Sequence, residues 1–125
     1  MKKMLILVTL IVTSVCAYAT DWQFYGPIYV DHHSIKRENT SVQAWIIHPD
    51  FAKSKLNNTK YTYEAAYIDA KCSVNEMAIL NTQWYNNRHE LVDNKIDPAE
   101  YVKVKSKTNN EVIFKALCEQ LPKTL

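Results

Sequence analysis

The chain has 125 residues, of which 47% are hydrophobic and 22% are charged, and its formal net charge is +2. This length fits one domain with its own hydrophobic core, and the near-neutral charge does not favour nucleic-acid binding, which needs a basic domain. The sequence contains a single glycine, Gly26, which excludes glycine-rich phosphate loops and the dinucleotide-binding fingerprint.

Residues 1–19 predict a secretory signal peptide of bacterial style. Two lysines near the start precede an almost entirely apolar stretch at residues 5–12, and residues 17–19 read Ala-Tyr-Ala, which suits signal-peptide cleavage. The stretch is too short for a permanent membrane span. We therefore expect a mature domain of residues 20–125 with no net charge, because the two lysines are the whole basic excess.

Cys16 allows a second interpretation of the leader, since lipoprotein signals end at a cysteine that becomes the lipidated first residue. Val15, directly before it, fits that cleavage poorly, so cleavage after Ala19 is favoured. The choice decides whether the product is free in the periplasm or anchored to a membrane by acyl chains. Either way, we expect a periplasmic or cell-surface location.

Cleavage after Ala19 leaves two cysteines, Cys72 and Cys118, in a compartment where disulfides persist. Two cysteines allow only one pairing. We therefore predict a Cys72–Cys118 disulfide in the mature protein.

The mature chain reads first as strands and then as one helix. We expect strands at residues 28–30, 42–48, 61–72, 74–85, 91–92 and 101–105. Asp31 and Ser34 flank two histidines in a predicted turn, where their side chains can bond nearby backbone amides. Little room remains at Ser73 for more than a tight turn.

A change of hydrophobic period marks the helix. Thr108, three residues before Glu111, forms a capping-box pattern. One apolar stripe follows, made of Val112, Ile113, Ala116 and Leu117. The predicted helix runs to about Gln120, because Pro122 stands where helices stop.

This order predicts an α+β domain, an antiparallel sheet of about five to six strands with a C-terminal helix packed on one face. Since Cys118 is on the helix, the even positions of residues 61–72, which share a face with Cys72, must lie under it. The odd positions then point to the opposite face, and they include Tyr61, Tyr63 and Tyr67.

An open face with three tyrosines is a candidate interface. One arrangement is a two-fold homodimer through Tyr61, Tyr63 and Tyr67. The alternative is that residues 22–25 or surrounding loops cover the rings within one chain.

Several motifs together resemble the surface-adhesin E family over nearly all the mature chain. They are Tyr-Val-Asp at residues 29–31 followed by Ser34 and Ile35, a strand ending at Cys72, Trp84 and Tyr85 late in the next strand, and a capped helix ending at Cys118. The resemblance implies a C-terminal helix tied to an antiparallel sheet by one disulfide. It also implies a dimeric envelope protein that binds host matrix and plasma proteins, but it transfers no binding residues.

The remaining side chains predict no catalytic site, metal site or cofactor. His32 and His33 would face opposite ways in an extended segment, and no histidine has the spacing typical of zinc ligands. Glu64 and Glu76 could approach on neighbouring strands, but we expect either a solvated pair or no pair at all. Ser34 lacks the separated base that a catalytic triad requires.

Two classes of function remain. The first is a non-enzymatic envelope binding protein that works through a sheet face and loops, with host matrix or plasma proteins as partners. The second is a soluble periplasmic protein that modulates or inhibits another envelope component. Neither class needs nucleic acid, and membrane anchoring follows only if Cys16 is lipidated.

Overall fold

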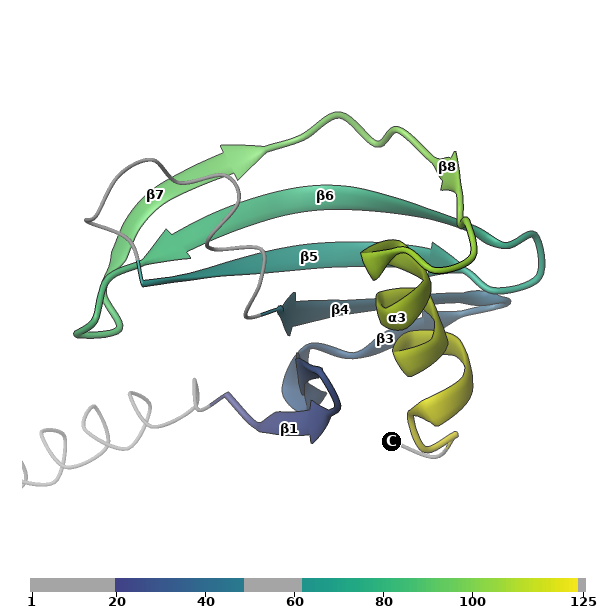
Figure 1. The fold of residues 1–125 in the computed structure, drawn as a ribbon, viewed down its shortest axis with the longest axis horizontal. Coiled ribbons are helices and arrows are strands. Elements are labelled where there is room, and N and C mark those ends of the chain that lie inside the picture. Colours follow the sequence, from purple (N-terminus) through teal and green to yellow (C-terminus); the bar gives the residue numbers. More distant parts are fainter. Residues whose placement is uncertain (1–19, 49–61, 124–125) are drawn as a thin grey trace, which may run out of the picture.

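A computed structural model describes residues 20–48 and 62–123, which form one antiparallel sheet with a helix against it (Figure 1). The strands are β1 (Trp22–Tyr25), β2 (Ile28–Asp31), β3 (Lys36–Glu38), β4 (Ser41–Ile47), β5 (Tyr63–Lys71), β6 (Glu76–Tyr85), β7 (Leu91–Ile96) and β8 (Val102–Lys103). A short 3₁₀ turn, η3 (His32–Ser34), follows β2. Helix α3 (Asn109–Lys115) continues into a π-helical segment, η4 (Ala116–Gln120). The predicted leader lies outside the described residues.

The hydrogen-bonded strand order is β1-β2-β4-β5-β6-β7, with β3 pairing β4 and β8 pairing β6. Every pair is antiparallel. The predicted α+β architecture is therefore confirmed, with eight strands in the described part of the chain. The additional strands β1 and β3 carry no clear apolar alternation, and all three residues of β3 are exposed.

The predicted last strand, residues 101–105, is shorter in the structure and covers only Val102–Lys103. The chain turns soon afterwards, where Lys107 has a φ of 61°. The alternation at residues 101–105 therefore does not continue as a paired strand. The strand expected at residues 91–92 is longer than predicted and reaches Ile96.

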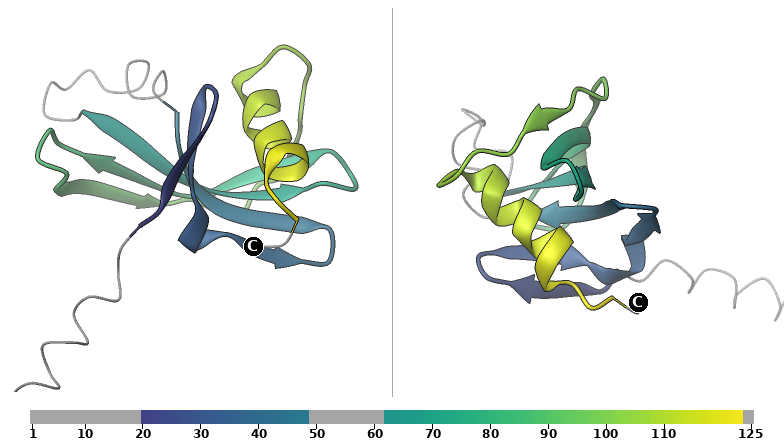
Figure 2. Two further views of the ribbon diagram at one scale, coloured as in Figure 1. Left: turned by 90° about the horizontal axis from the view of Figure 1, so that it is seen from below. Right: turned by 90° about the vertical axis from the view of Figure 1, so that its right-hand side faces the viewer.

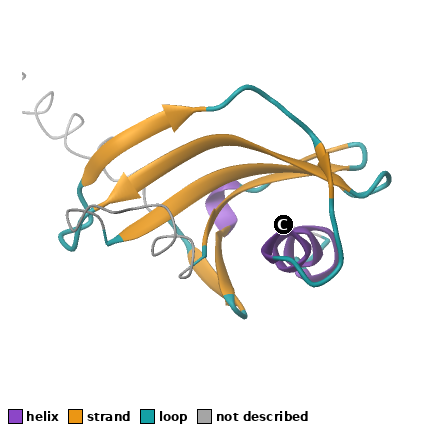
Figure 3. Ribbon diagram, turned by 45° about the horizontal axis from the view of Figure 1, so that its top comes forward, coloured by secondary structure: helices purple, strands orange, loops and turns teal. Residues whose placement is uncertain are grey.

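One face of the sheet packs against the helix, and we call it the inner face (Figure 3). The even positions of β5 lie there, as predicted from Cys72: Ile68 and Ala70 are fully buried. Ile113 and Leu117 of the helix are also fully buried in the same cluster. Each such branched side chain contributes about 1.5–3 kcal/mol by leaving water.

The β1–β2 hairpin stands on the same side of the sheet as the helix (Figure 2, left). Ile28 and Val30 of β2 are fully buried and join the core that the helix covers. The hairpin and the helix thus enclose the inner face between them.

Local signals define where the helix begins and ends. The Thr108 side chain accepts a hydrogen bond from the Glu111 backbone N–H at 3.3 Å, which confirms the predicted cap. The Glu111 carboxylate accepts a hydrogen bond from the Lys107 N–H at 3.3 Å. After Gln120 the chain leaves helical geometry, and Arg37 donates a hydrogen bond to the Pro122 carbonyl.

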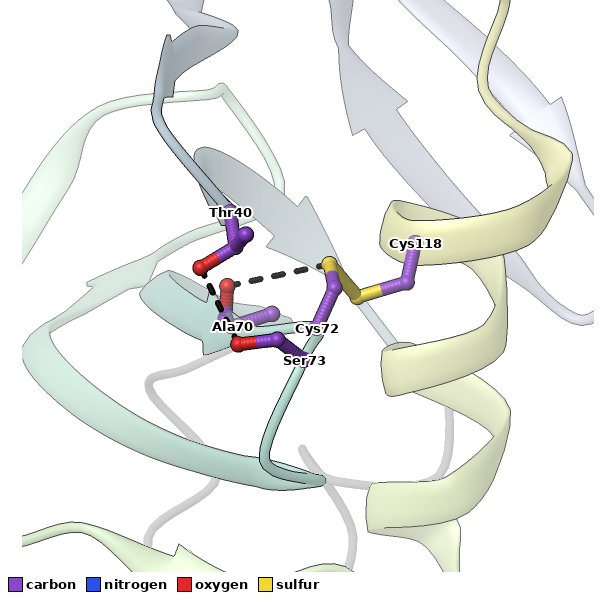
Figure 4. The surroundings of a disulfide bond; sticks show 5 residues. All are labelled: Thr40, Ala70, Cys72, Ser73 and Cys118. Carbon is purple, nitrogen blue, oxygen red and sulfur yellow. Dashed lines mark hydrogen bonds between the residues drawn. A yellow bond between two sulfur atoms is a disulfide. The ribbon is translucent and has the colours of Figure 1, made fainter.

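The predicted disulfide is present between Cys72, just after β5, and Cys118 in η4 (Figure 4). The two Cα atoms are 5.7 Å apart, which is an ordinary separation for a disulfide. The Cys72 N–H donates to the Thr40 carbonyl at 3.0 Å, and Ser73 bonds the Thr40 hydroxyl at 3.1 Å. The disulfide therefore joins the helix to the turn between β5 and β6, and that turn is itself hydrogen-bonded to the connection between β3 and β4.

Candidate functional site

The face of the sheet opposite the helix is the candidate site, and we call it the outer face. Residues directly opposite each other in register project on the same side of a sheet. One row across the outer face joins Trp45, Tyr67, Asn81 and Ile96, from β4 to β7. At the start of β5, Tyr63 lies opposite Tyr85, the last residue of β6.

Two aromatic pairs dominate this face. The ring centroids of Trp45 and Tyr67 are 5.3 Å apart with the rings tilted by 46°. Those of Tyr63 and Tyr85 are 5.0 Å apart and nearly parallel, at 9°. All four side chains are half-buried, and both separations suit favourable aromatic contacts. We call these four residues the aromatic face.

The side-chain amides of two glutamines hold the hydroxyl groups of Tyr67 and Tyr85 in place. The Tyr67 hydroxyl donates to Gln43 Oε1 at 3.2 Å, and the Tyr85 hydroxyl donates to Gln83 Oε1 at 2.6 Å. Burial raises the pKa of both hydroxyls above the usual value, and the Asp69 charge adds to the effect at Tyr67. The hydroxyls are therefore neutral donors at physiological pH.

The rings shield the sheet beneath them. Ala65, between Tyr63 and Tyr67 in the sequence, is consequently only 2% exposed. The N-terminal segment does not cover these rings, since β1 and β5 are separated by β2 and β4 in the strand order. In that hairpin Phe24 instead packs on Tyr29, with ring centroids 5.0 Å apart. Tyr61 lies outside the described residues.

A buried carboxylate borders the aromatic face. Asp69, opposite Gln43 in β4, is 5% exposed, and its Oδ2 accepts a hydrogen bond from the Tyr101 hydroxyl at 2.5 Å. The Lys71 ammonium lies 3.8 Å from the centre of the Tyr101 ring, within the range of a cation–π contact. Tyr101 therefore connects the segment between β7 and β8 to the middle of the sheet.

Replacing Tyr101 with Phe should lower the free energy of unfolding by about 1–2 kcal/mol at neutral pH, because the buried Asp69 carboxylate loses a donor. The hydrogen bond to Asp69, burial and the Asp69 charge raise the pKa of Tyr101 to about 12 in the folded protein. The stabilisation is thus complete below pH 10 and is lost as the pH rises through 12.

Urea unfolding of both proteins at pH 7 and pH 11 measures this effect. The difference between wild type and Tyr101→Phe should be smaller at pH 11. An equal difference at both pH values would show that the Asp69 hydrogen bond is not its source.

The predicted turn after β2 supports the aromatic face directly. Asp31 Oδ1 accepts hydrogen bonds from the N–H groups of Asp21 at 2.9 Å and His33 at 3.1 Å. The Ser34 hydroxyl donates to the Asp31 carbonyl at 2.7 Å and accepts from the Trp45 N–H at 2.9 Å. The sequence predicted the local bonds of this turn, but not its link to Trp45.

The titratable residues considered from the sequence do not gather into a site. Glu64 is buried, at 3% exposed, rather than solvated. It lies opposite Trp84, whereas Glu76 lies opposite Lys71, so the two residue positions are about 23 Å apart along the strands. In the part of the chain that the structure describes, no three His, Cys, Asp or Glu residues are close enough to hold a metal ion.

The paired histidines lie in the η3 turn, which the sequence predicted for this segment. His32 Nε2 is hydrogen-bonded to the Tyr25 hydroxyl at 2.6 Å. On the outer face, His89 Nδ1 is 3.2 Å from the Tyr63 hydroxyl. The two contacts give His32 and His89 roles in packing.

A hollow of about 560 Å³ lies between β6, β7 and the start of α3. Its polar side chains bond one another: Lys95 pairs with Asp97 at 3.2 Å, and Thr82 donates to Asp97 at 3.3 Å. Because these groups are already engaged, the outer face is the better candidate for binding a partner. Within residues 20–48 and 62–123, no helix has the length and hydrophobicity needed to cross a bilayer.

Comparison with known proteins identifies the family. The sequence model described as Surface-adhesin protein E matches residues 22–119. No curated protein and no solved structure matches the chain. The matched range contains the eight strands of the described residues, the aromatic face and both disulfide cysteines. The chain belongs to the surface-adhesin protein E family.

Proposed function

We propose that the protein is a non-enzymatic, exported binding protein of the cell envelope that holds a protein partner on its outer face. Membership of a surface-adhesin family supports this proposal. The observation that carries it is the aromatic face, four half-buried rings on the side of the sheet that the helix leaves uncovered. Host matrix and plasma proteins are the first partners to test.

The chemistry of the face suits protein recognition. Tyrosine and tryptophan offer large, rigid contact areas at low entropic cost, and their polar tips can bond a partner. Gln43 and Gln83 already hold two of the hydroxyls in place, which reduces the cost of ordering them on binding. Such pre-ordered aromatic residues are typical of interface hot spots.

A second candidate is a soluble periplasmic protein that modulates or inhibits another envelope component. Val15 before Cys16 favours it, because that residue fits lipoprotein cleavage poorly. This candidate would use the same outer face for a different partner.

The mass of the mature amino terminus distinguishes an anchored protein from a soluble one. We predict cleavage after Ala19, so that Thr20 is the first residue and the product carries no lipid. Intact-mass measurement of protein from its natural host checks this. A diacyl or triacyl mass on Cys16 would contradict the prediction and favour surface anchoring.

Tyr63→Glu should weaken partner binding at least about tenfold, because it removes one ring pair and places a charge at the interface. Immobilised mature protein is offered plasma, a basement-membrane extract and an envelope extract in parallel. The matched control is Val74→Glu, which changes an exposed apolar residue in the β5–β6 turn. Thermal unfolding confirms that both variants fold.

Binding from plasma or matrix supports the adhesin candidate, and binding from the envelope extract alone supports the modulator. An equal loss in Tyr63→Glu and Val74→Glu, or no loss in either, would contradict the assignment of the outer face.

A further inference from the structure

Asp69 on the outer face is a buried carboxylate without a cationic partner. The residue lies opposite Gln43 and is 5% exposed. One carboxylate oxygen, Oδ2, accepts the hydrogen bond of the Tyr101 hydroxyl, whereas the other, Oδ1, is buried without a hydrogen-bond partner. None of the ion pairs among the described residues includes Asp69. Because buried charges are normally paired, this carboxylate marks a place where a cation would be stabilised.

A second buried acceptor lies in the neighbouring row of the outer face. Asn81 is placed opposite Tyr67, which precedes Asp69 by two residues, and the Asn81 Oδ1 is also buried without a hydrogen-bond partner. Residues placed diagonally on adjacent strands are close enough for one long side chain to contact both. Two neighbouring acceptors without donors suit a group that carries several N–H donors and no acceptor, such as a guanidinium or an ammonium.

The surroundings of Asp69 already attract a cation of the same chain. The Lys71 ammonium lies 3.8 Å from the centre of the Tyr101 ring, which is a cation–π contact. Lys71 belongs to none of the ion pairs in the described part of the chain, because Glu76, which lies opposite it, pairs with Lys103 at 3.7 Å. The long Lys71 side chain can therefore leave the Tyr101 ring without breaking an ion pair.

We propose that Asp69 and the Tyr101 ring receive an arginine side chain of the protein partner, which displaces the Lys71 ammonium. Arginine suits the place better than lysine, because its planar guanidinium stacks on an aromatic ring while its fork of N–H groups donates to more than one oxygen. Asp69 Oδ1 is buried in the free protein, so a covering side chain must move, and Lys71 is a flexible one on the same face. This inference rests on the proposed function, since it names the chemistry of the partner that the outer face holds.

The aromatic face beside this point is neutral, so Asp69 supplies the charge that selects the partner. The hydroxyls of Tyr67 and Tyr85 are held by the uncharged amides of Gln43 and Gln83. Charges across an interface give specificity more than affinity, since a partner without the opposite charge leaves the buried one unpaired. We therefore expect the aromatic face to supply contact area and Asp69 to discriminate between partners.

Titration of the mature protein with acetyl-arginine amide, followed by heteronuclear NMR, tests the proposal. We expect saturable shifts of the backbone amide signals of Asp69, Lys71 and Tyr101, with weak affinity because one side chain makes few contacts. Acetyl-citrulline amide, which has nearly the same shape without the charge, should cause no such shifts. Absence of saturable shifts with the arginine compound would overturn the proposal, and equal binding of acetyl-lysine amide would contradict the assignment to arginine.

Two variants distinguish this role from a structural one. Asp69→Asn keeps an acceptor for the Tyr101 hydroxyl but removes the charge, and it should weaken arginine binding at least about tenfold. Lys71→Ala removes the competing cation, and it should strengthen arginine binding about two- to fivefold, the equivalent of an exposed cation–π contact. A Lys71→Ala protein that binds arginine no better than wild type would show that Lys71 is not displaced, which contradicts the proposal even if Asp69→Asn does not fold.

Glu76→Gln is the matched control. It removes a carboxylate that lies opposite Lys71 and is already paired with Lys103, so arginine binding should stay within about twofold of wild type. Thermal unfolding confirms that each variant folds. Equal losses in Asp69→Asn and Glu76→Gln would mean that the overall charge of the protein, and not the place at Asp69, attracts the arginine.

Capture of the partner from plasma, matrix and envelope extracts separates this inference from the proposed function. Loss of capture in both Tyr63→Glu and Asp69→Asn, with a gain in Lys71→Ala, supports both. Loss in Tyr63→Glu but not in Asp69→Asn would keep the outer face as the binding surface and exclude an arginine at Asp69. Full capture by Tyr63→Glu and by Asp69→Asn would contradict both.

Discussion

Replacing both Cys72 and Cys118 with alanine is expected to lower the free energy of unfolding by about 4 kcal/mol. The disulfide joins residues 46 positions apart in the sequence, so its loss frees a long loop in the unfolded chain. A domain of this size has a small core and little stability to spare. We expect the double variant to be folded at low temperature and partly unfolded near 37 °C.

Urea unfolding of the double variant and of wild type measures this effect. The double alanine variant avoids the free thiol that a single replacement would leave. Wild type treated with a reductant should unfold at nearly the same urea concentration as the variant. A loss below about 1 kcal/mol would mean that packing alone holds the helix on the sheet.

Leu117→Ala is expected to lower the free energy of unfolding by about 3 kcal/mol. Leu117 has no exposed surface and lies in the core cluster with Ile68 and Ile113. Truncation leaves a cavity under the helix. The disulfide at the next residue, Cys118, holds the helix in place, so the helix cannot shift to fill that cavity. Lys115→Ala, on the exposed side of the same helix, is the control and should change stability by less than about 0.5 kcal/mol.

Denaturant unfolding of Leu117→Ala and Lys115→Ala checks the difference. If the two variants lose equal stability, the helix does not pack through Leu117 as the structure shows. In the cysteine-free background the loss from Leu117→Ala should be smaller, because a helix without its covalent link can shift to fill part of the cavity.

The faces of the sheet could be predicted from the sequence because two simple rules meet at one residue. Strand side chains alternate, and Cys72 had to reach a cysteine on the helix. Together these rules placed Ile68 and Ala70 inside and Tyr63 and Tyr67 outside, which the structure confirms. The helix cap at Thr108 was equally predictable, since it depends on two residues only three positions apart, Thr108 and Glu111.

The contacts that shape the outer face could not be predicted, because they join residues far apart in the sequence. Ser34 reaches Trp45 across a strand connection, and Tyr101 reaches Asp69, 32 residues away. The irregular pairing of β5 with β6 between Tyr67 and Ile68 also leaves no local signal. Tertiary packing decides such features, and a periodic pattern does not record them.

Hydroxyl-radical footprinting of the mature protein, free and bound to the strongest partner recovered by capture, tests the outer face most directly. The modification of Trp45, Tyr63 and Tyr67 should fall on binding, while that of Phe114 and Leu117, on the inner face, should stay unchanged. Protection confined to residues away from the outer face, with the three rings as reactive as in the free protein, would contradict this account.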